Sequence, residues 1–196
     1  LFSAAAFMRN IDNVIYAGDS TIDAGAFIEE FAGEQWTYTG FLNGSDGKFS
    51  GIELNSVFFA DDFIQGLGLS ANVTFTDSEF RQANGETVGL PGTSDLIYNA
   101  AIFYEDYGIS ARLNYSWRDK WISPIEDPAE FWGEMTRLDA QISYTFPNQV
   151  NGSEVSVYAN FNNITDETDV RYAGNGTINQ AESYGMPSLI GVRVTY

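Results

Sequence analysis

The 196-residue chain contains no cysteine and no histidine. Without cysteine it can form neither a disulfide nor a thiolate metal site. Without histidine it lacks the commonest metal ligand and the commonest general base. Basic residues are also scarce, because 9 lysines and arginines stand against 27 acidic residues, which gives a formal net charge of −18. Since such a chain repels the phosphates of DNA and RNA, we expect neither thiol chemistry nor a nucleic-acid partner.

Long apolar runs are missing as well. No stretch reaches the length of about 18 consecutive apolar residues that is typical of a transmembrane helix, so no such helix is expected within these residues. Catalysis without histidine or cysteine would need paired carboxylates, but the adjacent acids Glu29–Glu30 and Glu126–Asp127 are typical of solvated loops. The loop acids around Asp166 do not follow the spacing of a complete calcium loop. We therefore expect no enzyme activity, no catalytic residue, no metal site and no cofactor.

The sequence is rich in segments where apolar and polar residues alternate. In the last ten residues, Ile190, Val192, Val194 and Tyr196 occupy every second position, and Arg193 lies between two of them. Period-2 alternation indicates a β-strand with one apolar and one polar face. Including this last segment, the same pattern predicts eight strands and no helix, at residues 1–16, 52–55 (reaching back toward 36), 67–76, 98–105, 109–118, 138–146, 155–162 and 187–196.

The predicted connections alternate in length. Short turns at 61–66, 106–108 and 147–152 alternate with long loops at 17–35, 77–95, 119–136 and 165–186, which hold 18 of the 27 acidic residues. Short turns at one end and long loops at the other are typical of bacterial outer-membrane barrels. The aromatic content of 15% also suits the aromatic girdles of such barrels. Leu1 lies inside an alternating run, so we expect the chain to begin within a longer protein.

Two groups of residues are candidates for function. The first is a set of aromatic side chains in the long loops, which can stack on sugar rings or anchor the loops: Trp121, Phe131, Trp132, Tyr172 and Tyr184. The second is Glu105 and Arg112, which lie on one face of a hairpin. They can form a charge pair facing the lumen, lining the permeation path or fixing the hairpin register.

Several stretches, in order from about residue 47 to 196, resemble the C-terminal barrel of TonB-dependent receptors. The stretches that carry the resemblance are Gly51-Ile52-Glu53-Leu54, Gly66-Leu67-Gly68-Leu69, Leu90-Pro91-Gly92-Thr93-Ser94, Tyr104-Glu105 with Ser110-Ala111-Arg112, Leu138-Asp139, Asn163-Ile164-Thr165-Asp166-Glu167, and Gly191-Val192-Arg193. The third and fourth stretches look most like the branch found in carbohydrate-using Proteobacteria. The segment Gly185-Met186-Pro187 departs from the family, which more often has a basic and an aromatic residue there.

The resemblance implies an all-β fold, namely the antiparallel transmembrane wall formed by the last eight strands of a 22-stranded barrel. Residues 1–196 would then be the C-terminal part of the barrel, without the plug domain and the earlier strands. It implies a Gram-negative outer-membrane transporter that imports a nutrient. Because the acidic loops are ill suited to an anionic ferric siderophore, for which clustered arginines are expected, we favour an oligosaccharide.

The implied partners follow from this assignment. They are outer-membrane lipid and lipopolysaccharide, the remaining barrel and its plug, the TonB complex through the missing N-terminal part, and the nutrient. The barrel assembly machinery would read the terminal signal of Ile190, Val192, Val194 and Tyr196. Two alternatives remain open on the residues alone. One is a complete eight-stranded barrel for anchoring or adhesion, since eight strands can close, and the other is a soluble sugar-binding β-sandwich.

Overall fold

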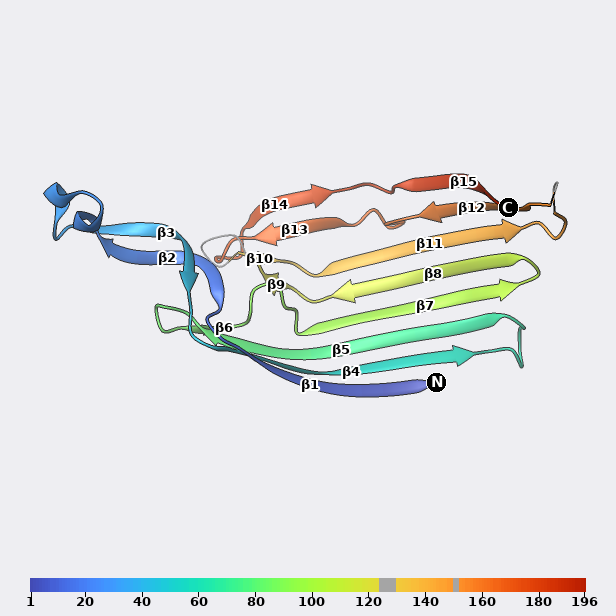
Figure 1. The fold of residues 1–196 in the computed structure, drawn as a ribbon, viewed down its shortest axis with the longest axis horizontal. Helices are drawn as coiled ribbons and strands as arrows, with labels where there is room; N and C mark the ends of the chain where they lie inside the picture. Colours follow the sequence, from blue (N-terminus) through green and yellow to red (C-terminus); the bar gives the residue numbers. More distant parts are fainter. Residues whose placement is uncertain (124–129, 150–151) are drawn as a thin grey trace.

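The computed structural model describes residues 1–123, 130–149 and 152–196, so the acid pair Glu126–Asp127 lies outside the described residues. Its main feature is one antiparallel sheet of long strands, which we call the wall (Figure 1). In spatial order the wall strands are β1 (Phe2–Ile11), β4 (Gly47–Phe59), β5 (Leu67–Arg81), β7 (Leu96–Asp106), β8 (Ile109–Arg118), β11 (Met135–Thr145), β12 (Glu154–Phe161) and β15 (Ser188–Thr195). The predicted all-β fold with eight main strands is confirmed.

The register of the wall separates apolar from polar side chains. Leu69, Ile102 and Leu113 lie opposite one another on β5, β7 and β8 and are 42–46% exposed. Asn72 and Asn99 lie opposite each other on the other face, where they share a hydrogen bond of 2.9 Å and are half-buried. The apolar face is thus the outward one, as in a sheet that faces lipid with the polar face toward a lumen.

Aromatic side chains gather near both ends of the apolar face. Tyr98 stacks on Trp117 at 5.0 Å and on Tyr115 at 6.0 Å between ring centroids, near the long loops. Tyr144 and Phe146 contact each other at 5.1 Å near the short turns. The wall strands contain 8 to 15 residues, and a transmembrane strand needs about 9–11. Two aromatic belts separated by the length of a strand match the two interfaces of a membrane.

The wall is an open sheet. Within the described residues, β1 pairs only with β4 and β15 only with β12, and Figure 1 shows these two strands at opposite edges. A closed eight-stranded barrel would pair β1 with β15, and a sandwich would pack the wall against a second sheet of similar size. The described residues form neither arrangement. The structure therefore supports neither the complete eight-stranded barrel nor the soluble β-sandwich that the sequence left open.

The first predicted strand differs from the structure. Residues 1–16 do not form one strand, because Asn13 adopts a left-handed backbone conformation with φ of 55° and separates β1 from β2 (Ile15–Asp23). Strand β2 pairs with β3 (Gln35–Asn43) in a hairpin that extends beyond the wall (Figure 1). The prediction that the strand at 52–55 reaches back toward Trp36 is therefore wrong, since β4 begins at Gly47 and Trp36 belongs to β3.

A small apolar core fixes the base of this hairpin to the wall. Val14 and Tyr16 pack with Phe80 of β5 and with Leu90, and all four side chains are buried. The backbone N–H of Ala83 donates a 2.8 Å hydrogen bond to the Tyr16 hydroxyl. Because Phe80 shares its face of β5 with Asn72 and Ser78, the hairpin base rests on the polar face of the wall.

The long loops contain more regular structure than the sequence pattern predicts. Four short strands form a second sheet, the rim sheet, in the order β14 (Ile178–Ser183), β13 (Thr168–Tyr172), β10 (Phe131–Trp132) and β9 (Trp121–Ile122). Strand β6 (Thr87–Val88) pairs with the end of β5, and two 3-10 helices, η1 (Ala24–Ala26) and η2 (Glu29–Phe31), form the hairpin tip. In the described part of the chain, no helix has the length and apolar character needed to cross a membrane.

Candidate functional site

The rim sheet brings four of the five predicted loop aromatics together. Phe131 stacks on Tyr172 with ring centroids 5.3 Å apart, and Trp132 stacks on Trp121 at 6.1 Å, both with nearly parallel planes. Because successive residues of a strand point to opposite faces, Phe131 and Trp132 place these two pairs on opposite faces of the rim sheet. Sequence spacing identified the aromatics, but the cross-strand pairing that makes them neighbours comes from the register of β9, β10 and β13.

Arginine side chains cover the tryptophan pair. The guanidinium of Arg118 lies 3.7 Å from the Trp121 ring centroid, and that of Arg171 lies 5.6 Å from the Trp132 centroid. Arg118 is held in place by hydrogen bonds from Nε to Ser94 Oγ (3.0 Å) and from Nη2 to the Gly92 carbonyl (3.1 Å). Contacts between cations and aromatic faces are attractive, so the two arginines hold both indole rings in their orientation.

A pocket of about 290 Å³ opens between the rim sheet and the end of β5. Its lining combines two of the predicted aromatics with polar and charged side chains: Ser78, Gly89, Leu90, Thr93, Asp95, Lys120, Trp121, Ile122 and Phe131. Ser78, Thr93, Asp95 and Lys120 were not predicted as site residues. They lie at the ends of wall strands, and no local motif marks them; only the fold brings residues about 40 positions apart to one place.

Tyr184 lies apart from the stacked aromatics, at the end of a polar chain along the rim sheet. Glu130 and Arg171 form an ion pair at 3.2 Å with both side chains largely buried. Arg171 donates to Gln180, and both Gln180 and the Tyr184 hydroxyl donate to the Glu182 carboxylate. The bond to Glu182, in which the phenol is the donor, raises the pKa of the Tyr184 phenol above its ordinary value.

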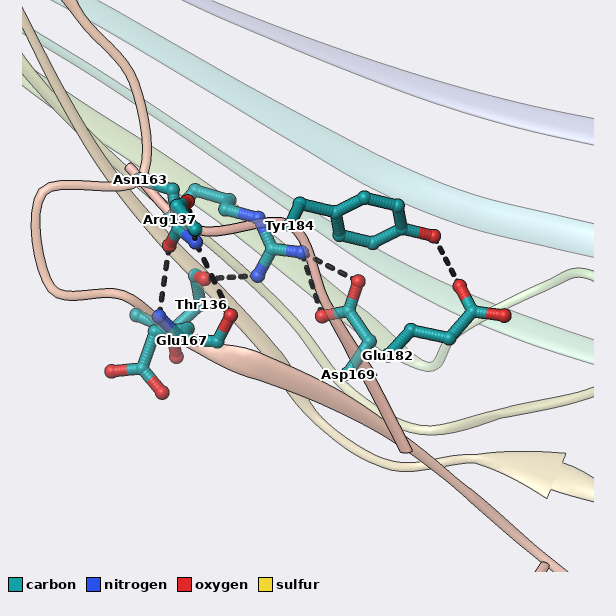
Figure 2. A network of polar contacts seen from close by, with 8 residues as sticks. Thr136, Arg137, Asn163, Glu167, Asp169, Glu182 and Tyr184 are labelled. Carbon is teal, nitrogen blue, oxygen red and sulfur yellow. Dashed lines mark hydrogen bonds and ion pairs between the residues drawn. The ribbon is translucent and has the colours of Figure 1, made fainter. Parts of the chain in front are cut away.

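Two residues attach the rim sheet to the wall (Figure 2). Nη2 of Arg137 on β11 donates to both carboxylate oxygens of Asp169 on β13, at 2.6 and 2.5 Å. Asn163, buried and with φ of 52°, accepts a hydrogen bond from the Glu167 N–H at 3.0 Å and donates to the Gly185 carbonyl at 3.0 Å. It thereby joins the start of the loop after β12 to the segment that precedes β15.

These contacts bear on metal binding. The described residues contain no group of three or more acidic side chains arranged to hold a metal ion. Asp169, one of the loop acids considered for calcium, has both carboxylate oxygens bound to Arg137. Its role in the structure is to form an ion pair.

The predicted lumen pair is arranged differently from a direct ion pair. Glu105 and Arg112 lie on the same face, but the register places Glu105 opposite Ser110 and Arg112 opposite Phe103. The Arg112 guanidinium lies 5.0 Å from the Phe103 ring centroid. Among the ion pairs of the described residues none joins Glu105 to Arg112, so the hairpin register is supported by a cation–π contact.

The terminal strand, for which an assembly signal is predicted, separates apolar from polar side chains. Val192 and Val194 lie opposite Val157 and Val155 on the apolar face, where the exposed fractions of the two β15 residues are 65% and 47%. Ile190 lies on the same face opposite Ala159, and Tyr196 is fully exposed at the end of the chain. Arg193 points to the polar face, with its guanidinium 5.6 Å from the Tyr158 ring centroid.

Comparison with known proteins agrees with this architecture. Neither the comparison with curated proteins nor that with solved structures gave a match. The family model described as "TonB dependent receptor-like, beta-barrel" matches residues 1–164. That match covers most of the wall and includes the first 46 residues, for which the sequence motifs gave no resemblance. The chain therefore belongs to the TonB-dependent receptor β-barrel family, and is a portion of the barrel of a non-enzymatic transporter in the Gram-negative outer membrane.

Proposed function

We propose that the wall forms the last eight strands of a 22-stranded barrel, and that a plug domain and the earlier strands are supplied by other parts of the receptor. The support is the pair of open edges, β1 and β15. Unpaired backbone groups at a sheet edge are not tolerated in lipid, so each edge needs a neighbouring strand. Contact with the TonB complex would then be made through the plug, while β15 carries the signal for the assembly machinery.

We propose further that the receptor imports an oligosaccharide. The observation that carries this proposal is the set of stacked aromatic pairs on the rim sheet, Phe131–Tyr172 and Trp121–Trp132. Flat apolar rings beside carboxylates, amides and hydroxyls are suited to ligands that combine an apolar ring face with many hydroxyl groups. Ligand sites in general combine apolar or aromatic walls with a few well-placed polar groups.

The arginines of the rim argue against an anionic ferric siderophore. Recognition of such a ligand would need guanidinium groups available for charge-assisted hydrogen bonds. Arg118 is bound by Ser94 and Gly92, Arg137 by Asp169, and Arg171 by Glu130. Arg137 and Arg171 neutralise carboxylates within the protein, Arg118 is hydrogen-bonded to neutral groups of the chain, and the surrounding loops are strongly acidic.

The experiment is nutrient uptake by cells that express the full-length receptor in a strain lacking it. Radiolabelled linear oligosaccharides of glucose, xylose and N-acetylglucosamine are compared with a ferric siderophore, with and without a functional TonB. We expect TonB-dependent uptake of at least one oligosaccharide. The triple variant with Trp121→Ala, Trp132→Ala and Tyr172→Ala should lose most of it at normal surface abundance. Uptake of the siderophore alone, or full oligosaccharide uptake by the triple variant, would contradict the proposal.

A further inference from the structure

The pocket at the base of the rim sheet offers three kinds of group to a ligand. Phe131 supplies aromatic surface and Trp121 borders it, Ser78 and Thr93 supply hydroxyls, and Lys120 and Asp95 supply charged groups. The volume of about 290 Å³ lies just below the range of roughly 300–1,000 Å³ for small-molecule sites. A pocket of this size accommodates one ring of a longer ligand and leaves the remaining rings outside.

The hydroxyls in the pocket are already ordered. Ser78 Oγ and Thr93 Oγ1 are 2.8 Å apart, and Thr93 Oγ1 is 2.5 Å from the Leu90 carbonyl oxygen, to which it can donate. The Leu90 N–H donates to Ser78 Oγ at 3.1 Å. These bonds hold one side of the pocket in a fixed shape, so a ligand binds there without first ordering the loop, which would cost conformational entropy.

The two charged residues of the pocket have opposite signs and remain accessible. Lys120 and Asp95 are both exposed, and within the ranges that the structure describes neither side chain takes part in an ion pair. The Lys120 ammonium lies 6.0 Å from the Phe131 ring centroid, on the lining of the pocket. An ammonium donates hydrogen bonds and a carboxylate accepts them. Lys120 can therefore donate to the oxygen of one hydroxyl group, and Asp95 can accept the proton of another.

We propose that this pocket binds a single uncharged sugar ring, of hexose or pentose size, from the imported oligosaccharide. Phe131 contacts an apolar face of the ring, Lys120 donates to one hydroxyl and Asp95 accepts from another, while Trp121, stacked on Trp132 and covered by Arg118, only borders the pocket. A uronic acid would meet the carboxylate of Asp95 as well as the ammonium of Lys120, and an amino sugar would meet both groups in the opposite sense, so a charge on the sugar gains nothing, whereas an uncharged ring uses both groups as hydrogen-bond partners. This inference rests on the proposed oligosaccharide function and assigns one part of the rim to one ring.

The test is binding by the full-length receptor purified in detergent, measured by titration calorimetry. The probes are oligosaccharides of four to seven rings built from glucose, xylose and N-acetylglucosamine, with oligogalacturonate and chitosan oligomers as charged counterparts. Variants are Phe131→Ala, Lys120→Gln and Asp95→Asn. Lys48→Gln is the matched control for Lys120→Gln, because Lys48 is an exposed lysine outside this pocket.

We expect at least one neutral probe to bind and the charged counterparts to bind more weakly. Phe131→Ala should weaken binding of that neutral probe about tenfold, equivalent to one 1.4 kcal/mol step. Lys120→Gln and Asp95→Asn should each weaken it by a smaller factor, about threefold to tenfold, as expected for one lost hydrogen bond to a charged group. Lys48→Gln should bind as the unmodified receptor does.

Two different failures can be told apart. If the unmodified receptor binds none of the probes and imports none of them, the oligosaccharide function is wrong and the pocket assignment falls with it. If the unmodified receptor binds a neutral probe and the three pocket variants bind it equally well, the function stands and the pocket assignment is overturned. Preferential binding of a charged counterpart would overturn the uncharged-ring claim specifically.

Discussion

Arg137 and Asp169 connect the wall to the rim sheet through a short ion pair, with Arg137 on β11 and Asp169 on β13 (Figure 2). The Asp169 side chain is only 5% exposed, whereas that of Arg137 is 24% exposed. The guanidinium also donates from Nη1 to the Thr136 carbonyl at 2.7 Å. The rim sheet, and with it the aromatic site, is thus tied to a strand that crosses the membrane.

Breaking this ion pair should loosen the rim sheet. Removing one partner of a buried pair typically costs about 3–5 kcal/mol. Because Arg137 is partly exposed, we expect about 2–3 kcal/mol for Arg137→Ala. The measurement is hydrogen exchange of the β13–β14 segment in the full-length receptor, which reports local opening. The double variant Arg137→Ala with Asp169→Ala should cost less than the sum of the two single variants, and strict additivity would contradict the coupling.

Asn163 is expected to combine two stabilising roles. Its side chain bonds to Glu167 and Gly185, and its backbone adopts a left-handed conformation. Asn163→Ala removes the bonds, each worth about 0.5–1.5 kcal/mol, and keeps a Cβ in the left-handed conformation, which costs about 1–2 kcal/mol and which asparagine tolerates through local hydrogen bonds. Asn163→Gly also removes the bonds, but glycine adopts this conformation without the Cβ cost. Exchange rates over residues 163–185 should therefore rise most for alanine and less for glycine. Equal rates for the two variants would show that the backbone conformation carries no cost.

The wall could be predicted from sequence because apolar and polar residues alternate along its strands. Leu69, Ile102 and Leu113 each belong to the apolar half of the alternation in their own strand, and the register places these halves on one face. The break at Asn13 could not be predicted, since apolar residues continue on both sides of it and the deciding feature is one backbone angle. The short strands β9 and β10 contain two residues each, too few for any periodic pattern.

The candidate site was predictable only in part, for a related reason. Aromatic residues in long loops stand out by type, and Trp121, Phe131, Trp132 and Tyr172 do gather on the rim sheet. Lys120 and Asp95 carry no distinguishing pattern among the other charged loop residues. Their place in one pocket depends on how the loops after β5 and β8 fold over the polar face of the wall.

Gly68 provides the space that lets the Phe103 ring lie flat against the wall. A Cβ atom at Gly68 would lie within 2.9 Å of three atoms of that ring, and Phe59 blocks one side by an edge-to-face contact at 6.0 Å. Overpacking of this kind costs about 1–3 kcal/mol, so Gly68→Ala should lower the midpoint of urea unfolding of the receptor. Adding Phe103→Ala should remove the clash. The double variant should therefore be no less stable than Phe103→Ala alone, and a further loss relative to that single variant would mean that the clash is not the cause.

The two faces of β15 should respond differently to charge. Val192→Arg places a charge on the lipid face, at a cost of about 2–4 kcal/mol near the membrane midplane. Arg193→Gln only removes a cation–π contact with Tyr158 on the polar face, worth about 0.5–1 kcal/mol at an exposed site. The heat-modifiable fraction in the outer membrane should fall strongly for Val192→Arg and little for Arg193→Gln. The reverse order would mean that the faces are inverted.

The assembly signal of the last strand can be tested separately from its stability. Deleting Tyr196 from the full-length receptor removes the exposed terminal aromatic without changing the paired residues of β15. We expect slower insertion, seen as delayed appearance of the heat-modifiable form after pulse labelling, with an unchanged unfolding midpoint for the molecules that do assemble. Normal insertion kinetics would remove Tyr196 from the signal.

The most direct test of the transmembrane wall uses single cysteine labels, since the chain itself has no cysteine. Glu30→Cys lies at the tip of the β2–β3 hairpin, Asp62→Cys in the short turn between β4 and β5, and Leu113→Cys on the apolar face of β8. The probe is a bulky membrane-impermeant maleimide, applied to intact cells and to cells with a permeabilised outer membrane. The account predicts labelling of Glu30→Cys in intact cells, of Asp62→Cys only after permeabilisation, and of Leu113→Cys in neither. Labelling of Asp62→Cys in intact cells, or of Leu113→Cys in the assembled receptor, would contradict it.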